Sequence, residues 1–277
     1  MYTRNSTSRI SSFMMIIATV LFILSCKGGN KTSDSDQAAS DNLNRELLAS
    51  DIKEVIYPLP APVEMTQMLN EIGATYTSGI LNPTANVEKY VTEQAKALNL
   101  GVYAADLSYA ATFNQQQDVQ ACLNSIKSLA DQLGVTYNYS SILSEENKAK
   151  FENKDSLTNF ITNTIYSTYQ YLDEKSNPDL AVDMVTGVWV ELMYIATNIS
   201  EASYNFSGLV DIISNQKASY EKVMNLLAER NSNADIKALE TKLMALKPAF
   251  DKVESGLSQA DFTLILNTIK DVRKSLV

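Results

Sequence analysis

The sequence predicts an all-α fold, and three observations support that prediction. Beyond residue 62 apolar residues recur with a period near 3.6 in nearly every segment, which is the pattern of helices that bury one face. No segment shows the strict alternation of a half-buried strand between hairpin turns. The 277 residues include only nine glycines and six prolines, too few for the frequent turns of a β-rich domain. We therefore expect a single, bundle-like domain of several helices.

The first 25 residues have the three parts of a secretory signal. A polar stretch contains Arg4 and Arg9, an uncharged apolar run extends from Phe13 to Leu24, and the small residue Ser25 follows. The run has 12 residues, whereas a helix that spans a bilayer needs roughly 20 apolar residues. We expect this segment to be a removable signal peptide and not a permanent membrane span.

The residues that end the apolar run, Ile23-Leu24-Ser25-Cys26, resemble the lipobox of bacterial lipoproteins. The resemblance implies cleavage before Cys26 and acylation of its thiol and of the freed amine. Because each buried methylene contributes about 0.8 kcal/mol, two or more acyl chains give stable anchoring. The alternative is an ordinary signal peptide that happens to contain a cysteine.

Residues 27–41, KGGNKTSDSDQAASD, contain no large apolar side chain and predict a flexible tether. Its root-mean-square span would be roughly 20 Å. The expected organisation is a signal peptide at 1–25, a lipidated cysteine and tether at 26–41, and a helical domain at 42–277. Near the start of that domain, the prolines of 57–62 predict an extended strap between helices.

Apolar stripes predict the helices that follow the strap. The stripes cover residues 119–133, 157–172, 209–227, 236–253 and 262–276. Gly134 is placed to end the first of these helices. Asp155 or Ser156 is expected to cap the second helix, and Pro248 is expected to bend or interrupt the fourth.

The composition excludes several classes of function. The chain has 23 basic and 32 acidic side chains, and removal of residues 1–25 takes away two arginines and no acid, so the net charge changes from −9 to −11. Such acidity argues against nucleic acid as a partner. The chain also has no histidine, which excludes His-based catalytic triads and His-containing zinc sites. Without a metal-ligand spacing or a phosphate loop, we expect a non-enzymatic protein that has no cofactor.

Two segments of the chain resemble each other in sequence, and we call this weak repeat the internal echo. A single deletion aligns Asp106-Leu-x-Tyr-x-Ala-Thr with Glu191-Leu-x-Tyr-x-Ala-Thr, and each segment begins with Gly-Val, at Gly101 and Gly187. The match indicates two pseudo-repeated helical units about 85 residues apart. Each copy has one carboxyl group inside an apolar helix. If the two helices face each other across a pseudo-twofold axis, two acids will meet in the core.

Two interpretations of these acids remain open. The first is a polar pocket for a cation or a small polar ligand. Its candidate lining residues are Asp106, Tyr109, Trp189, Glu191 and Tyr194. The second is a structural polar network that ties the helices and the tyrosine hydroxyls together, and it is favoured because such networks also place acids in protein cores.

The run Lys96-Ala-Leu-Asn-Leu-Gly-Val-Tyr-Ala-Ala-Asp-Leu-Ser-Tyr109, together with the lipobox and the tether, is similar to a group of all-helical lipoproteins of Bacteroidota. The resemblance implies an outer-membrane protein, lipid-anchored at the periplasmic face or the cell surface, and implies no activity. The membrane, an envelope protein or a small ligand are the expected partners. A non-enzymatic scaffold or binding module is the leading hypothesis, and the alternative is a small-ligand or cation binder around Asp106 and Glu191.

Overall fold

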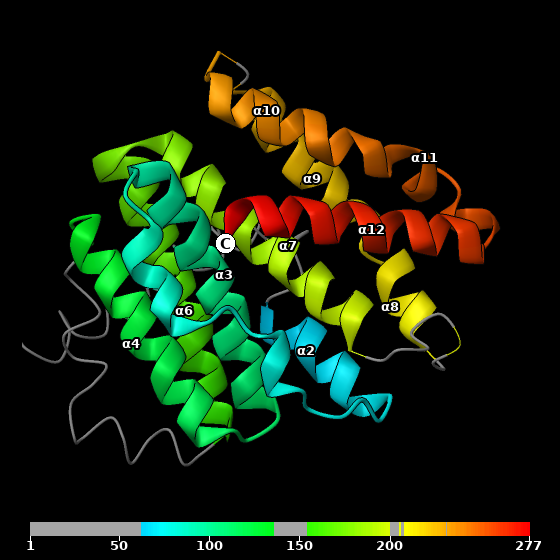
Figure 1. The fold of residues 1–277 in the computed structure, drawn as a ribbon, viewed down its shortest axis with the longest axis horizontal. Helices are drawn as coiled ribbons and strands as arrows, with labels where there is room; N and C mark the ends of the chain where they lie inside the picture. The colour runs from blue at the N-terminus through cyan, green and yellow to red at the C-terminus, as the bar shows by residue number, and fades with distance from the viewer. Residues whose placement is uncertain (1–61, 136–153, 200–204, 206–207, 231) are drawn as a thin grey trace, which may run out of the picture. The chain divides into compact units, whose positions relative to one another are not determined.

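A computed structural model of the chain describes residues 62–135, 154–199, 205, 208–230 and 232–277. All of these residues belong to one compact unit, which spans 48–277. The signal segment, Cys26, the tether and the strap up to residue 61 lie outside the described residues. Within the described ranges the chain forms helices and no strand, which confirms the all-α prediction (Figure 1).

Two helices form the centre of the domain, α3 (Glu93–Thr112) and α7 (Pro178–Asn198). Both are surrounded on all sides, because every residue of 97–110 and of 180–193 is buried. By length and composition α7 could cross a membrane, but 94% of its most apolar window is buried inside the domain. Because its apolar surface is covered by other helices, α7 serves as a core helix here.

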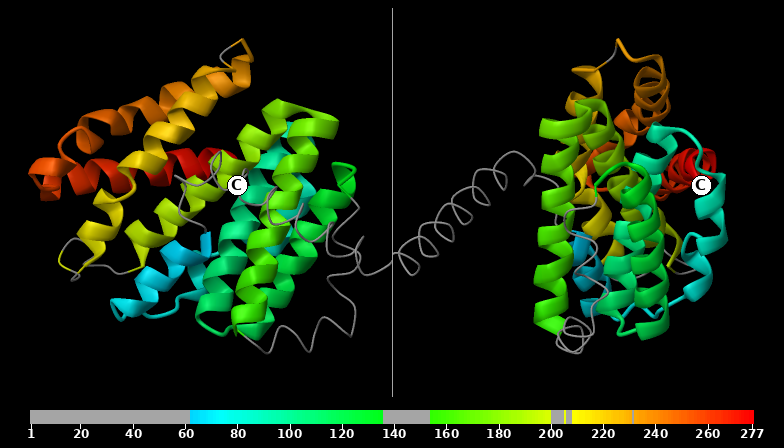
Figure 2. Two further views of the ribbon diagram at one scale, coloured as in Figure 1. Left: turned by 180° about the vertical axis from the view of Figure 1, so that it is seen from behind. Right: turned by 90° about the vertical axis from the view of Figure 1, so that its left-hand side faces the viewer.

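The other helices cover this central pair (Figure 2). On α3 pack α2 (Pro62–Glu71), α4 (Gln116–Gln132) and α6 (Lys154–Tyr171). On α7 pack α8 (Leu209–Ser214), α9 (Lys217–Ala228) and α12 (Gln259–Leu276). Two further helices, α10 (Ala234–Leu243) and α11 (Lys247–Phe250), lie against α9 and α12.

Short 3₁₀ and π turns connect these helices. They are η1 (Ser78–Ile80), η2 (Thr84–Lys89), η3 (Leu172–Ser176), η5 (Met244–Leu246) and η6 (Val253–Ser255). The first two, η1 and η2, lie in the connection between α2 and α3. This connection contacts the buried polar residues at the centre of the domain.

Local residues set the end of α4, as expected at Gly134, and the start of α7. Gly134 has a φ of +76°, and the N–H of Val135 donates to the carbonyl oxygen of Ala130 at 2.8 Å, which together close α4. Asn177 caps α7, because its side-chain oxygen accepts a hydrogen bond from the N–H of Asp179 at 3.0 Å.

Two expectations about helix boundaries need correction, and a third is confirmed. The stripe at 209–227 forms two helices, α8 and α9. At the junction the backbone N–H of Gln216 donates to the carbonyl of Ile213 at 3.0 Å, and its side-chain amide donates to the carbonyl of Ile212 at 3.3 Å. Helix α6 already begins at Lys154, so Asp155 and Ser156 lie inside its first turn rather than at a cap. The stripe at 236–253 is interrupted as predicted, but the 3₁₀ turn η5 precedes Pro248.

The two halves of the internal echo meet where α3 and α7 are closest. A Cβ atom on Gly101 would lie 2.0 Å from the carbonyl oxygen of Met184, and one on Gly187 would lie 2.0 Å from that of Leu98. Each glycine therefore touches the backbone three residues before the other glycine. This reciprocal contact is what a pseudo-twofold relation between the two helices requires.

Substitution of either glycine by alanine should destabilise the domain strongly. The added methyl group would meet rigid backbone atoms, so α3 and α7 would have to separate, at a cost of about 3 kcal/mol or more. Urea unfolding of Gly101→Ala and Gly187→Ala measures this loss. Gly79→Ala is the matched control, because no atom of the described residues lies within 4 Å of the Cβ position there. Equal stability of the three variants would contradict the tight contact.

Candidate functional site

The two acids of the internal echo lie just beyond the glycine contact and face each other. Asp106 follows Gly101 by five residues on α3, and Glu191 follows Gly187 by four on α7. Both side chains are completely buried, with 0% of their surface exposed. Each carboxyl group is close enough to alter the pKa of the other. Thus α3 and α7 place two ionisable groups together in the centre of the domain.

A third charged side chain, Arg273 of α12, completes this cluster. Its Nε donates to Oε2 of Glu191 at 2.7 Å, and its Nη2 donates to Oε1 at 2.8 Å. Such a two-pronged bond is the strongest arrangement between a guanidinium and a carboxylate. Nη2 also donates to the carbonyl oxygen of Ile80 in η1 at 3.1 Å. Arg273 is only 11% exposed, so this is an interior ion pair that joins α7, α12 and the η1 turn.

Sequence reasoning missed Arg273, although a signal for it was present. In the stripe of α12, residue 273 lies four positions after Ile269 and three before Leu276, so it belongs to the same helix face. An arginine on an apolar face needs a buried anion as its partner. The two acids of the internal echo were the obvious candidates for that partner.

The polar environment of Asp106 differs from that of Glu191. Its Oδ2 accepts a hydrogen bond from the backbone N–H of Asn82 at 2.9 Å, whereas its Oδ1 has no donor among the described residues. Burial, and then the negative charge of Glu191, raises the pKa of Asp106 well above its usual range. Burial also raises the pKa of Glu191, but the hydrogen bonds and the charge of Arg273 oppose that rise.

Asn82 links this charge cluster to a second group of buried polar side chains. Its amide nitrogen donates to the hydroxyl of Tyr90 at 2.9 Å and to Oδ1 of Asn99 at 3.3 Å. Asn99 in turn donates to the carbonyl oxygen of Leu276 at 2.8 Å, near the C-terminal end of α12. The network therefore fastens α12 to α3 as well as to α7.

Of the predicted lining residues, the structure brings three together. Tyr194 joins Asp106 and Glu191 through Arg273, whose guanidinium carbon lies 4.0 Å from the centre of the Tyr194 ring. Tyr109 instead stacks on Tyr76, with ring centres 4.8 Å apart, and its hydroxyl accepts a hydrogen bond from the N–H of Thr77 at 2.9 Å.

Trp189 also points away from the acids. Its ring lies 5.9 Å from that of Tyr220 and 6.4 Å from that of Phe250, between α7 and the helices α9 and α11. Its indole nitrogen is buried and has no acceptor among the described residues. The aromatic residues that precede or follow the two acids in sequence therefore serve different contacts and do not line one pocket.

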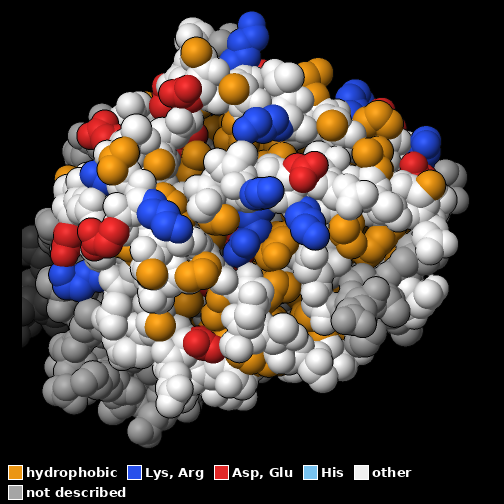
Figure 3. All heavy atoms as spheres, viewed as in Figure 1, with side chains coloured by type: hydrophobic (Ala, Val, Ile, Leu, Met, Phe, Trp, Pro, Cys, Tyr) orange, Lys and Arg blue, Asp and Glu red, His pale blue; other side chains and the backbone are white. Residues whose placement is uncertain are grey.

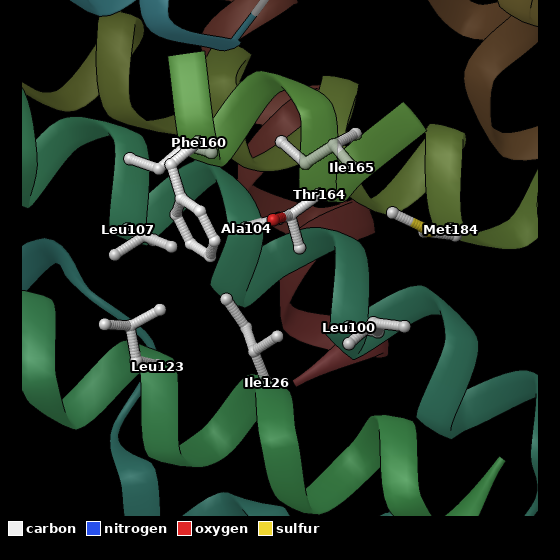
Figure 4. Close-up of a pocket in the computed structure, with 10 residues that line it drawn as sticks. Leu100, Ala104, Leu107, Leu123, Ile126, Phe160, Thr164, Ile165 and Met184 are labelled. Atoms are coloured by element: carbon white, nitrogen blue, oxygen red, sulfur yellow. The ribbon is translucent and has the colours of Figure 1, made fainter. Parts of the chain in front are cut away.

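Among the described residues, a small cavity and a surface groove lie away from the charge cluster. An apolar one of about 10 Å³ lies between α3, α4 and α6, where Phe160 and Ile165 face Leu123 and Ile126 across α3 (Figure 4). It has room for about one water molecule. A polar groove of about 360 Å³ lies between η2 and α4, beside Glu88. Neither is lined by Asp106 or Glu191.

A further buried acid, Asp183, lies on the first half of α7. It is 1% exposed, and Oδ1 accepts a hydrogen bond from the amide of Gln94 at 3.4 Å. Burial raises the pKa of Asp183 to about 7, against this hydrogen bond, and the charges of Asp179 and Asp235 add to the rise. Asp183 therefore changes its charge near neutral pH.

Comparison of the chain with protein-family models, with curated proteins and with solved structures finds no match. Within the described residues no group of three or more Asp, Glu, Cys or His side chains is arranged as metal ligands. The site consists of the ion pair between Arg273 and Glu191 and of a second acid, Asp106, which together occupy the centre of the domain.

Breaking the buried ion pair should cost far more than breaking a surface pair. Arg273→Met leaves Glu191 charged and without its partner, and we expect the free energy of unfolding to fall by about 3–5 kcal/mol. In the control Lys127→Met, which breaks an exposed pair with Asp131, the loss should be about 1 kcal/mol or less. Denaturant titration measures both.

A second substitution separates loss of charge pairing from loss of packing. Adding Glu191→Met to Arg273→Met removes the stranded charge, and it should recover part of the lost stability. No recovery in the double variant would show that the ion pair is not the origin of the effect.

Proposed function

We propose that this chain is a lipid-anchored helical lipoprotein of the bacterial envelope, a non-enzymatic scaffold or binding module that holds another protein. One observation carries the non-enzymatic, protein-binding part of the proposal. The polar centre that could have received a small ligand is filled by the chain's own Arg273, and both oxygens of Glu191 accept from it. Asp106 and Glu191 then join helices, and recognition is left to the surface of the domain.

The anchoring part of the proposal depends on the sequence at Cys26, which lies outside the described residues. The resemblance of Ile23–Cys26 to a lipobox and the shortness of the apolar run before it support acylation. The acidic charge of the chain supports it too, because electrostatic adhesion to anionic lipids would need an excess of basic residues.

We propose the face crossed by α12 as the surface that meets the partner. Lys and Arg side chains gather in the middle of this face (Figure 3), although the chain as a whole is acidic. Lys242, Lys270 and Lys274 are exposed, and Lys242 donates to the hydroxyl of Ser275 at 3.0 Å. In the described part of the chain no acidic side chain forms an ion pair with Lys270 or Lys274. This lysine patch suits a partner that presents acidic residues.

Replacement of Cys26 tests the anchor. Cys26→Ala removes the only acylation site that the lipobox offers, so we expect no incorporation of labelled palmitate and loss of the protein from the membrane fraction. Cys122→Ala is the control, because Cys122 is buried in the core and should leave acylation unchanged. Full membrane retention of Cys26→Ala would refute the lipid anchor.

Charge reversal in the lysine patch tests the partner surface. Chemical crosslinking in cells that produce the protein should give an adduct of defined mass. Lys270→Glu with Lys274→Glu should weaken that adduct at least several-fold, because the patch then repels an acidic partner. Lys127→Glu with Lys247→Glu changes the net charge equally on α4 and α11 and should leave it intact. Equal loss in both variants, or no adduct from the unaltered protein, would contradict this proposal.

The alternative, a binder of small polar ligands or cations around Asp106 and Glu191, requires Arg273 to leave its position. It therefore predicts a ligand that competes with a bonded guanidinium. Native mass spectrometry of the purified full chain distinguishes the two, because a retained small molecule that is lost in Asp106→Asn would support the alternative.

A further inference from the structure

The charges of the buried cluster do not balance if every group is ionised. Asp106 and Glu191 would carry two negative charges, and Arg273 supplies one positive charge. The other arginine of the described residues, Arg230, lies near Asp173 of η3 and near Asp179 in the first turn of α7. Because the chain has no histidine, none can supply a second positive charge here. An uncompensated charge in the interior is strongly unfavourable.

The hydrogen bonds show where the imbalance lies. Both oxygens of Glu191 accept from Arg273, so Glu191 is bonded as a carboxylate. Asp106 receives one backbone N–H, from Asn82, and its Oδ1 receives none from the described residues. Two carboxyl groups that face each other can form a hydrogen bond only if one of them carries a proton. Asp106 is the group that has room for it.

The other titratable groups around Asp106 do not change this count. Tyr103 on α3 donates its hydroxyl to the carbonyl of Pro83 at 2.9 Å, and Tyr90 accepts from Asn82. Cys122 on α4 is buried, and burial raises the pKa of its thiol well above the usual value. Tyr194 lies against Arg273. Burial also raises the pKa values of Tyr90 and Tyr103, so these two hydroxyls and the thiol stay neutral at physiological pH and leave the two acids and the arginine to set the charge.

We propose that Asp106 and Glu191 hold one proton between them, carried by Asp106, and that this proton couples the docking of α12 to pH. With the proton in place the cluster of Asp106, Glu191 and Arg273 is neutral, and Asp106 donates to Glu191 while Arg273 binds the same carboxylate. Loss of the proton leaves two facing carboxylates beside one guanidinium. The repulsion between them acts on the side chain that fastens α12 to α7.

The sign of the pH dependence follows from the direction of the pKa shift. The folded protein keeps the proton of Asp106 above pH 3.8, the ordinary value at which the unfolded chain releases it. The folded state therefore binds more protons than the unfolded state, and stability falls as pH rises from about 4 toward the raised pKa. The contribution is complete below pH 4 and is lost on the alkaline side.

Two isosteric substitutions in the full chain test the location of the proton. Asn mimics a protonated Asp, since its amide can donate to Glu191 and its oxygen can accept from Asn82. At pH 7 we expect Asp106→Asn to raise the melting temperature by about 5 °C, with the gain vanishing near pH 4. Glu191→Gln removes the carboxylate that Arg273 needs and should lower it by roughly 10 °C. Asp131→Asn, at an exposed site, is the control for loss of one charge.

The outcome that overturns the proposal is the opposite pattern. A lower melting temperature of Asp106→Asn at pH 7, with Glu191→Gln tolerated, would place the proton on Glu191. Asp183 also titrates near pH 7. Because it is unchanged in all of these variants, its effect on the melting temperature cancels when they are compared.

Infrared spectroscopy provides a measurement that does not depend on a destabilised variant. At pH 6 in an Asp183→Asn background, where ordinary Asp and Glu side chains are ionised, the full chain should retain the carbonyl band of a protonated carboxylic acid, and Asp106→Asn should abolish that band. Its absence from the Asp183→Asn protein would refute the shared proton.

Hydrogen exchange tests the coupling to α12. Protection of the amides of 269–276, corrected for the intrinsic pH dependence of exchange, should fall at alkaline pH, and it should stay constant in Asp106→Asn. Identical pH profiles in the two proteins would refute the coupling.

Discussion

The backbone contact between α3 and α7 is the constraint on which the rest of the structure depends. At Gly101 and Gly187 the two helices approach so closely that neither position has room for a Cβ atom. This contact brings Asp106 and Glu191 together, because they lie just beyond the glycines on the two helices. Two buried acids then require a positive charge, and among the described residues Arg273 of α12 supplies it through its bonds to Glu191. The position of the last helix thus follows from a contact between two earlier ones.

An interior ion pair contributes more to the arrangement of helices than to total stability. The attraction between Arg273 and Glu191 is largely offset by the cost of removing both groups from water. A misplaced α12, however, would leave charged groups buried without partners, and the free energy of burying an unpaired charge is strongly unfavourable. The bond to Ile80 and the bond from Asn99 to Leu276 add two further fixed points on neighbouring segments. Together they define one register for α12 that apolar packing of Ile265 and Ile269 alone would specify less strictly.

Two apolar segments of the chain, α7 and the run Phe13–Leu24, are similar in composition but differ in their expected roles. Helix α7 is long and apolar enough to cross a membrane, yet its surface is almost entirely covered by other helices, chiefly α3, α9 and α12. The run Phe13–Leu24 is shorter than a span and precedes Cys26. If the proposed anchor is correct, the lipid holds the chain on the membrane and the most apolar helix serves the interior of the domain. The surface over α12 then remains available for a partner.

The sequence alone determined the helical class of this protein, the location of several helices, including α4 and α12, and the pair Asp106 and Glu191, because these depend on local periodicity, capping and an internal echo. It also supplied the stop at Gly134 and the interruption near Pro248. Tertiary structure decided the partner of the acids, since Arg273 lies 82 residues from Glu191 and no local pattern encodes that distance. It also directed Tyr109 and Trp189 away from the acids. Side chains on one helix point in different directions, and only the neighbouring helices determine which of them meet.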